Sequence, residues 1–279
     1  MNKIVVLGKN GNLSKSFQRR FPNSVVLNRE IYMKWLKNEG LLETFFSKIC
    51  QEVTHDRVYV LNCTGVVDSR TDLNELMDVN FRLPLLLSQK SVQLDYCLVT
   101  FGTVMESLPK YCQSNNYLKS KYAFYKEYQA NRVWLNQNFH FQLHTLFGGD
   151  HIQPALFLGQ IYQSIINKKD FYMGNGEQLR EYHLLEDVTQ MVERTLARKE
   201  KGVVTISHGK PHKLGELAKE IFQSFNLLPL LKVNAISTSK FDNVDKYWQP
   251  SEGYIGKSLE EITNSIITWM NMVGEQDGE

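Results

Sequence analysis

Short apolar segments alternate with segments of helical spacing through the first half of the chain, and this alternation constrains the fold more than any other feature. The apolar segments read "KIVVLG", "SVVLNR", "DRVYVLNCTG", "YCLVTFGT" and "FHFQLHTLFGG". They are rich in β-branched and aromatic residues, as strands are, and amphipathic helical patterns separate them. Strands and helices that alternate in this way build βαβ units around a parallel sheet. We therefore expect an α/β fold, a Rossmann doubly wound parallel sheet.

The pattern changes after Gly149. From there helical segments predominate, with turn-rich stretches between them and one further strand, "GVVTISHG". We expect residues 1–149, together with about 186–207, to form the Rossmann domain. Residues of about 150–185 and 208–279 would form a smaller, mostly helical C-terminal lobe.

Charge and hydropathy exclude several classes of protein. The 32 basic and 30 acidic residues give a net charge of +2, and no basic run is dense enough to indicate nucleic-acid binding. No apolar stretch is long enough to cross a bilayer, and the N-terminus lacks the features of a signal peptide. We expect a cytoplasmic protein that binds neither nucleic acid nor membrane.

The potential metal ligands are scattered along the chain. Neither the four cysteines nor five of the histidines show the close spacing of a metal site, so we expect no metal. These residues are Cys50, Cys63, Cys97, Cys112, His144, His151, His183, His208 and His212.

The turn "GKNGNLS" stands between the first strand and the first helix. Gly8 and Gly11 allow a tight turn there and let backbone amides approach a pyrophosphate at the helix N-terminus. A glycine pattern of this kind is weak evidence alone, because a plain βα turn uses glycine too. Its place in the first βα unit nevertheless favours a dinucleotide site. The residues that we expect to bind the cofactor here are Gly8, Asn10, Gly11, Asn12 and Leu13.

The end of the second strand bears on the choice of cofactor. NAD requires an acidic residue there for the adenosine ribose, but this chain has Asn28 followed by Arg29. A guanidinium in place of a carboxylate suits a 2′-phosphate, so NADP(H) is favoured over NAD(H). In the alternative, Arg29 is a solvated loop residue and Glu30 supplies the carboxylate.

Two tyrosine–lysine pairs have the spacing that puts both side chains on one face of a helix: Tyr117 with Lys121, and Tyr122 with Lys126. A phenol has a pKa of about 10, and a neighbouring ammonium lowers it, which suits general acid catalysis. Tyr117 opens the helix after a polar loop, whereas Tyr122 lies among other aromatic residues. We expect Tyr117 and Lys121 to be catalytic and the second pair to be packing and surface.

These motifs resemble a known family when taken with "LNCTG", "LMDVN" and "GEQLREYHLLEDV" in this order. They are similar to the extended short-chain dehydrogenases/reductases of the NAD-dependent epimerase/dehydratase superfamily. Within that group the chain looks most like nucleotide-sugar 4-ketoreductases, such as dTDP-4-dehydrorhamnose reductase and CDP-abequose or CDP-paratose synthase. The resemblance covers roughly residues 3–225. It implies an NAD(P)-binding Rossmann domain and a lobe that binds a nucleotide-diphosphate sugar, and it allows a homodimer.

The resemblance also implies roles for individual residues. Lys121 and the turn after the third strand would line the cofactor; that turn comprises Asn62, Cys63, Thr64 and Gly65. On the substrate side, Arg180 would meet the diphosphate, and Thr103, Phe147 and Gly148 would frame the sugar.

The third catalytic residue of the family, a serine or threonine, has no exact counterpart. Counted back from Val104, its place is taken by Phe101. A slip of one residue would let Thr100 act instead, which is our expectation, with Thr103 in reserve. The loop also lacks the Asp-Glu pair of the family's dehydratases, which favours a reductase.

The function that the resemblance implies is NADPH-dependent reduction of the C4 ketone of a nucleotide-linked 4-keto-deoxy sugar. The product would serve synthesis of a surface polysaccharide such as the O-antigen of lipopolysaccharide or a capsule. Two alternatives stay open: an epimerase that keeps NAD(P) tightly bound, and a non-catalytic protein of the same fold that senses NADP.

Overall fold

The computed structural model describes residues 2–52, 57–237 and 247–276. The chain divides into two compact units. The first comprises Met1–Leu143 and Val188–Thr205, and the second comprises His144–Asp187 and Ile206–Glu279. The chain therefore leaves the first unit a few residues before the expected boundary at 149 and returns to it through one helix.

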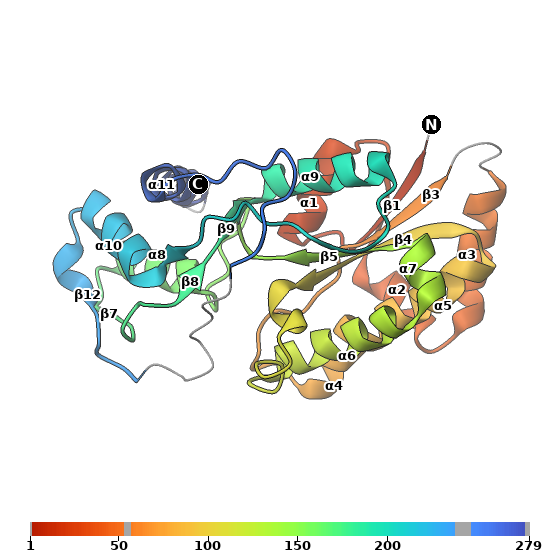
Figure 1. Cartoon of the computed structure of the whole chain (residues 1–279), viewed down its shortest axis with the longest axis horizontal. Helices are drawn as coiled ribbons and strands as arrows, with labels where there is room; N and C mark the ends of the chain where they lie inside the picture. The colour runs from red at the N-terminus through yellow and green to blue at the C-terminus, as the bar shows by residue number, and fades with distance from the viewer. Residues whose placement is uncertain (1, 53–56, 238–246, 277–279) are drawn as a thin grey trace. The chain divides into compact units, whose positions relative to one another are not determined.

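The first unit is built on a six-stranded sheet (Figure 1). The strand order is β10-β5-β4-β3-β1-β2, and every pair of neighbours is parallel. The strands are β1 (Lys3–Leu7), β2 (Val25–Leu27), β3 (Val58–Asn62), β4 (Tyr96–Thr103), β5 (Phe139–Leu143) and β10 (Gly202–Thr205). Helices flank this sheet on both faces, as an all-parallel sheet requires. The predicted Rossmann fold is confirmed.

Helices α1 (Asn12–Arg20) and α9 (Leu185–Arg198) cover one face of this sheet (Figure 1). Their contact is polar: the Ser16 and Thr189 hydroxyls are 3.3 Å apart, and Arg20 Nε donates to Glu193 at 2.7 Å. The helices on the other face are α2 (Arg29–Trp35), α3 (Glu39–Gln51), α4 (Leu73–Met77), α5 (Leu83–Gln93), α6 (Asn116–Ala130) and α7 (Arg132–Gln137). These helices follow one another in pairs, and each pair is separated by an interruption rather than by a strand.

The interruptions have local causes. Asn38 and Asn131 accept hydrogen bonds from amides in the first turns of α3 and α7, so each starts a new helix. Between α4 and α5 the chain forms a π-helical turn over Asp78–Arg82. Such turns absorb one extra residue within a helix, which helical periodicity does not reveal.

Successive residues of β4 and β5 point to opposite faces of the sheet. Tyr96 and Leu98 pack in the cluster that contains Phe46 and Leu87, on the side of α3 and α5. Phe101 has the opposite parity, and its ring lies 5.5 Å from that of Phe17 in α1. The α1 face of these two strands is therefore aromatic.

The second unit has a helical core. Its helices are α8 (Phe157–Asn167), α10 (Leu214–Ser224) and α11 (Leu259–Gln276). Three short strand pairs accompany them: β6 (Thr145–Phe147) with β9 (Tyr182–Leu184), β8 (Leu179–Arg180) with β11 (His212–Lys213), and β7 (Phe171–Tyr172) with β12 (Leu231–Lys232). The strand expected over 139–149 is in fact two strands, because its second part, β6, pairs within this unit. No helix in the described part of the chain is long and apolar enough to cross a membrane.

Asn138 ties the start of β5 to β4 and α5. Its amide is fully buried, accepts from the Leu98 amide at 2.9 Å and donates to the Ser91 hydroxyl at 2.9 Å. Asn138→Ala leaves a buried N–H without an acceptor, which we expect to lower the free energy of unfolding by about 1–3 kcal/mol. Urea unfolding measures this. The exposed Asn136→Ala is the control and should change stability by less than about 0.5 kcal/mol; equal losses in both variants would contradict the assignment.

Candidate active site

Two turns at the carboxyl ends of neighbouring strands meet closely in the first unit. Gly8 follows β1 with φ at +102°, a conformation that favours glycine, and a Cβ there would lie 3.2 Å from the Cys63 carbonyl. Its amide donates to Leu27 O at the end of β2. The glycine turn, with Asn10 at its tip and Asn12 and Leu13 opening α1, therefore lies against the "LNCTG" turn. Two segments predicted to bind one cofactor come together.

The second turn is fixed by its own side chains. Thr64 donates its hydroxyl proton to Asn62 Oδ1 at 2.6 Å. Asn80 binds Val66 through both its carboxamide atoms and donates to Ser120 of α6 at 3.0 Å. Asn80 therefore holds this turn against the helix that carries Tyr117 and Lys121.

Lys121 reaches the same turn from α6. Its Nζ donates to Phe101 O, near the end of β4, at 2.8 Å, and lies 3.9 Å from the place that a Cβ on Gly65 would occupy. The ammonium thus sits where the β3 and β4 edges of the sheet adjoin. Burial lowers its pKa, and the carboxylate of Glu106 opposes that shift.

Tyr117 lies four residues before Lys121, at the start of α6. Burial raises the pKa of its phenol above the ordinary value, and the charge of Glu106 raises it further. The sequence led us to expect a pKa lowered by Lys121. The structure favours the neutral phenol instead, which is the form that donates a proton.

Asn28 and Arg29 stand at the end of β2 as expected, but each has a partner in the protein. The Asn28 side chain caps α2 by accepting from the Ile31 amide at 3.2 Å. Arg29 forms an ion pair with Glu75 at 2.7 Å, and 53% of its side chain is exposed. An exposed pair of this kind is weak, so the guanidinium can exchange Glu75 for a phosphate.

Thr100 and Phe101 point to opposite faces of the sheet, so the phenylalanine does not separate Thr100 from α6. The Thr100 hydroxyl lies 2.8 Å from His140 Nδ1 and 3.2 Å from Phe139 O, and the residue is 2% exposed. Its proton is therefore used within the protein. Thr103 is less buried, and its oxygen accepts from the Met105 amide at 3.3 Å, which leaves its hydroxyl proton to donate elsewhere.

The second tyrosine–lysine pair is a surface feature. Lys126 is exposed, and its Nζ lies over the Tyr122 ring at 5.8 Å from the centroid. Such an exposed cation–π contact stabilises the helix slightly and leaves no group directed at the turns described above.

The expected substrate residues of the second unit differ in whether they can contact a ligand. They are Arg180, Phe147 and Gly148. Arg180 is half-buried on β8, beside His212 of β11, and its Nη1 donates to Leu179 O. Gly148 has φ at +101°. Phe147 is 1% exposed and packs in the core against Trp269, so its ring cannot contact a ligand.

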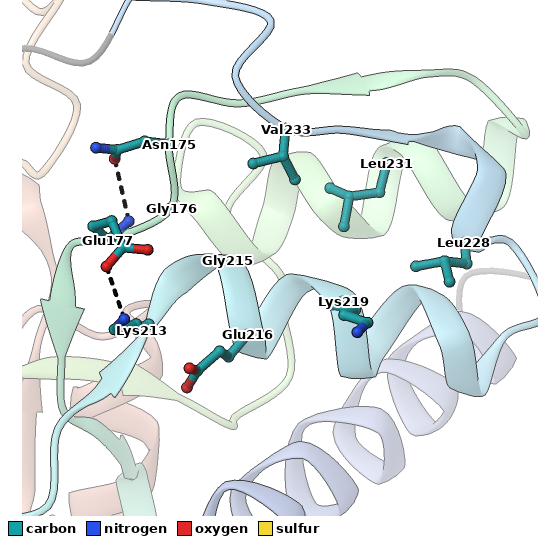
Figure 2. A pocket seen from close by; sticks show the side chains of 10 residues that line it. All are labelled: Asn175, Gly176, Glu177, Lys213, Gly215, Glu216, Lys219, Leu228, Leu231 and Val233. Carbon is teal, nitrogen blue, oxygen red and sulfur yellow. Dashed lines mark hydrogen bonds and ion pairs between the residues drawn. The ribbon is translucent and has the colours of Figure 1, made fainter.

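A hollow lies beside β8 and β11 in the second unit (Figure 2). One side is apolar, with Leu228, Leu231 and Val233, and the other is polar. On the polar side Lys213 binds Glu177 at 2.8 Å, and Lys219 and Glu216 follow on α10. The charges of this lining cancel. The hollow therefore suits a flat, neutral group better than a diphosphate.

A cluster that the sequence did not reveal forms where β6 pairs with β9. In that register His144 is the neighbour of Glu181, and His183 lies two residues beyond Glu181 on the same face. Glu181 is 1% exposed and accepts from the Ser207 hydroxyl, the His208 amide and His183 Nε2, at distances from 2.8 to 3.1 Å. Burial raises the pKa of Glu181, but the contacts with His183, His144 and His208 outweigh it and bring that pKa to about 2.

Ligand atoms of His144, Glu181 and His183 lie within 4.8 Å of one another, a spacing that a divalent ion can bridge. Hydrogen bonds within the protein already hold Glu181 and His183, whereas His144 Nε2 has no hydrogen-bond partner among the described residues. A metal on His183 Nε2 would remove its bond to Glu181 and leave the proton on Nδ1, which has no partner among the described residues. We therefore describe the cluster as a buried anion held by hydrogen bonds.

Known proteins match this chain in fold but not in sequence. No protein-family model matches the sequence, and no curated protein matches it. Solved structures do share the fold. They include UDP-N-acetylglucosamine 4-epimerase from Methanobrevibacter ruminantium M1 in complex with UDP-N-acetylmuramic acid, with 12% identity, a TM-score of 0.74 and 98% of each chain covered.

Two further structures agree with this. The Bordetella bronchiseptica enzyme WbmG in complex with NAD and UDP is 14% identical with a TM-score of 0.74, over 98% of this chain and 96% of that one. dTDP-4-dehydrorhamnose reductase from Bacillus anthracis in complex with NADP is 17% identical with a TM-score of 0.69, over 96% and 99%. This chain therefore shares its fold with these three enzymes.

The Glu181 cluster makes stability depend on pH. Burial lowers the pKa of His144 to about 3 and of His208 to about 4, from 6.5. The unfolded chain therefore binds protons below pH 6.5 that the folded chain does not, and folding weakens as the pH falls from 6.5 to 4. We expect the free energy of unfolding to drop over this range by about 1–3 kcal/mol for each histidine.

His144→Gln should reduce this dependence, whereas His151→Gln, at an exposed position, should keep it. Urea unfolding at pH 7, 5.5 and 4 measures the slopes. A slope unchanged by His144→Gln would refute the role given to this histidine.

Proposed function

We propose that the protein is an NADPH-dependent reductase that acts on the C4 ketone of a nucleotide-linked 4-keto-deoxy sugar. The observation that carries the proposal is the position of Lys121. Its ammonium joins the end of β4 to the Gly65 turn, and the Tyr117 phenol precedes it on the same helix face. A proton donor and an orienting cation therefore stand at the carboxyl edge of a Rossmann sheet, where ligands of this architecture bind.

The residues present fit a dinucleotide. Gly8 and Gly11 form a tight turn at the start of α1, where no side chain caps the helix, and the Asn62–Gly65 turn lies directly beside it. When bound, NADPH supplies the hydride for the carbonyl carbon. Lys121 would hold the ribose hydroxyls next to it. Tyr117 would then give its proton to the alkoxide oxygen that forms.

The same geometry bears on the third catalytic residue. Because the Thr100 proton is donated within the protein, Thr103 is the better candidate to polarise the ketone. Its oxygen is fixed by the Met105 amide while its proton stays available. Thr100 would then support the site from beneath.

The cofactor preference rests on Arg29. Its exposed ion pair with Glu75 keeps a guanidinium at the end of β2. Asn28, which stands where an NAD-binding chain has an acidic residue, provides no carboxylate for the ribose. A 2′-phosphate offers Arg29 a stronger, charge-assisted partner. We therefore infer NADPH rather than NADH as the reductant.

The nucleotide would bind to the second unit. Arg180 offers its guanidinium to the diphosphate, and the neighbouring hollow offers the apolar surface of Leu228, Leu231 and Val233 to the base. Enzymes of the same fold provide support, since WbmG was solved with UDP. A deoxysugar nucleotide made in this way would serve synthesis of a surface polysaccharide.

Turnover with a panel of CDP-, dTDP-, GDP- and UDP-linked 4-keto-6-deoxy sugars tests the proposal. We expect oxidation of NADPH, followed by absorbance, with at least one sugar and more slowly with NADH. Tyr117→Phe should lower the rate about 100-fold or more, because it removes the proton donor. Tyr122→Phe is the matched control on the same helix and should retain activity.

The outcomes separate the alternatives. Equal rates for Tyr117→Phe and the wild type would refute the mechanism. A protein that purifies with bound NAD and interconverts C4 epimers without net oxidation would be an epimerase. Binding of NADP without turnover of any sugar would favour a sensor.

Arg180→Met should weaken binding of nucleoside diphosphates about 10-fold to 100-fold, because a charge-assisted contact is lost. Isothermal titration calorimetry with CDP, dTDP, GDP and UDP measures this. Arg132→Met removes an exposed arginine of the first unit and should not change the affinity. Equal effects of the two substitutions would exclude Arg180 as the diphosphate ligand.

A further inference from the structure

Glu106 is a carboxylate buried beneath α6, and the proposed chemistry gives it no role. It lies in the 3₁₀ turn Val104–Ser107 that follows β4, and it is 0% exposed. Its side chain folds back over its own strand, where a Cβ on Gly102 would lie 2.1 Å from Oε1. Glycine at 102 is what makes room for this carboxylate.

The neighbouring strand fixes one oxygen of Glu106. His140 Nε2 lies 2.6 Å from Oε1, and Gln142 Nε2 donates to the same oxygen at 3.3 Å. His140 Nε2 faces Glu106, and its Nδ1 lies 2.8 Å from the Thr100 hydroxyl. Thr100, His140 and Glu106 thus form one chain of hydrogen bonds, and all three are at most 2% exposed.

The other oxygen, Oε2, has no hydrogen-bond partner among the described residues. If Glu106 served packing alone, a neutral side chain of the same size would avoid the cost of burying a charge with one oxygen unsatisfied. A buried carboxylate persists when a cation compensates it. His140 can pair with it directly, at 2.6 Å from Oε1, and the Lys121 ammonium lies nearby, on the carbonyl of Phe101, the residue before Gly102.

The groups that face Glu106 come from three directions. On β5 these are His140 and Gln142, and on α6 the charge of Glu106 acts on Tyr117, Lys121 and Tyr125. From the loop between them the Cys112 thiol lies 3.7 Å from the Glu106 carbonyl oxygen. The tyrosine–lysine pair therefore has a buried carboxylate beside it, which balances the charge of Lys121 when Glu106 is ionised and His140 is neutral.

We propose that Glu106 is a positioning residue that supplies the counter-charge of Lys121 and thereby keeps Tyr117 in its neutral, proton-donating form. The inference rests on the proposed reductase function. A lone ammonium would favour the phenolate, which accepts protons and suits oxidation. A carboxylate beside it cancels this effect, so the site favours donation to a substrate alkoxide. Glu106 would thus bias the enzyme towards reduction.

Glu106→Gln removes the charge at nearly constant shape, and Glu106→Asp retains it. We expect the alkaline limb of the pH profile of kcat/KM to lie at about pH 10 or above in the wild type. Glu106→Gln should move it down by about one pH unit or more, because Lys121 then acts on Tyr117 alone. Glu106→Asp should restore most of the wild-type position. Glu127→Gln removes an exposed carboxylate from the same helix and should leave the limb in place.

A second measurement does not need turnover. In protein labelled with ¹³C at tyrosine Cζ and bound to NADP, the resonance lost in Tyr117→Phe reports the ionisation of Tyr117. If no sugar is reduced, the proposed function fails, but this titration still decides the role of Glu106.

The inference would be overturned if folded Glu106→Gln kept the wild-type alkaline limb of kcat/KM or the wild-type ionisation pH of Tyr117. Equal shifts in Glu106→Gln and Glu106→Asp would also overturn it, since they would indicate a purely structural role. If Glu106→Gln does not fold, the wild-type titration still tests the inference: ionisation of Tyr117 well below about pH 10 would overturn it.

Discussion

A parallel sheet must be covered on both faces, and this constraint governs the first unit. Each strand then sends alternate residues into two different environments. In β4 and β5 one set, which includes Phe101, Phe139 and Phe141, stacks towards α1. The other set, which includes Thr100 and His140, lies beneath α6. Two neighbouring strands thereby form an aromatic layer and a polar layer back to back.

The polar layer is what distinguishes this active site from a plain tyrosine–lysine pair. α6 brings Tyr117 and Lys121 over strands that carry a buried hydrogen-bond network, rather than over apolar side chains. Burial disfavours the phenolate and the ammonium alike. The proposed chemistry would therefore depend on charges beneath the helix as well as on the pair itself.

Much of this site follows from local sequence. Glycines between a strand and a helix predicted the Gly8 turn, and helical spacing put Tyr117 and Lys121 on one face. Phe101 takes the place of the family's serine or threonine but does not lie between Thr100 and α6, because adjacent residues of a strand point to opposite faces. That could have been predicted from periodicity, had β4 been expected to stay regular through Thr103. That the Thr100 hydroxyl already has a partner within the protein could not have been predicted, because this partner, His140, lies forty residues later in the chain.

The sequence by itself determined the parallel α/β fold, the glycine turn and the Tyr117–Lys121 pair, because each depends on residues close together in the chain. Only the tertiary structure decided which groups surround them. Glu106 reaches His140 because a 3₁₀ turn folds it back over Gly102. His144 meets Glu181 because β6 pairs with β9. Pairing between distant strands sets such contacts, and no spacing within one segment encodes them.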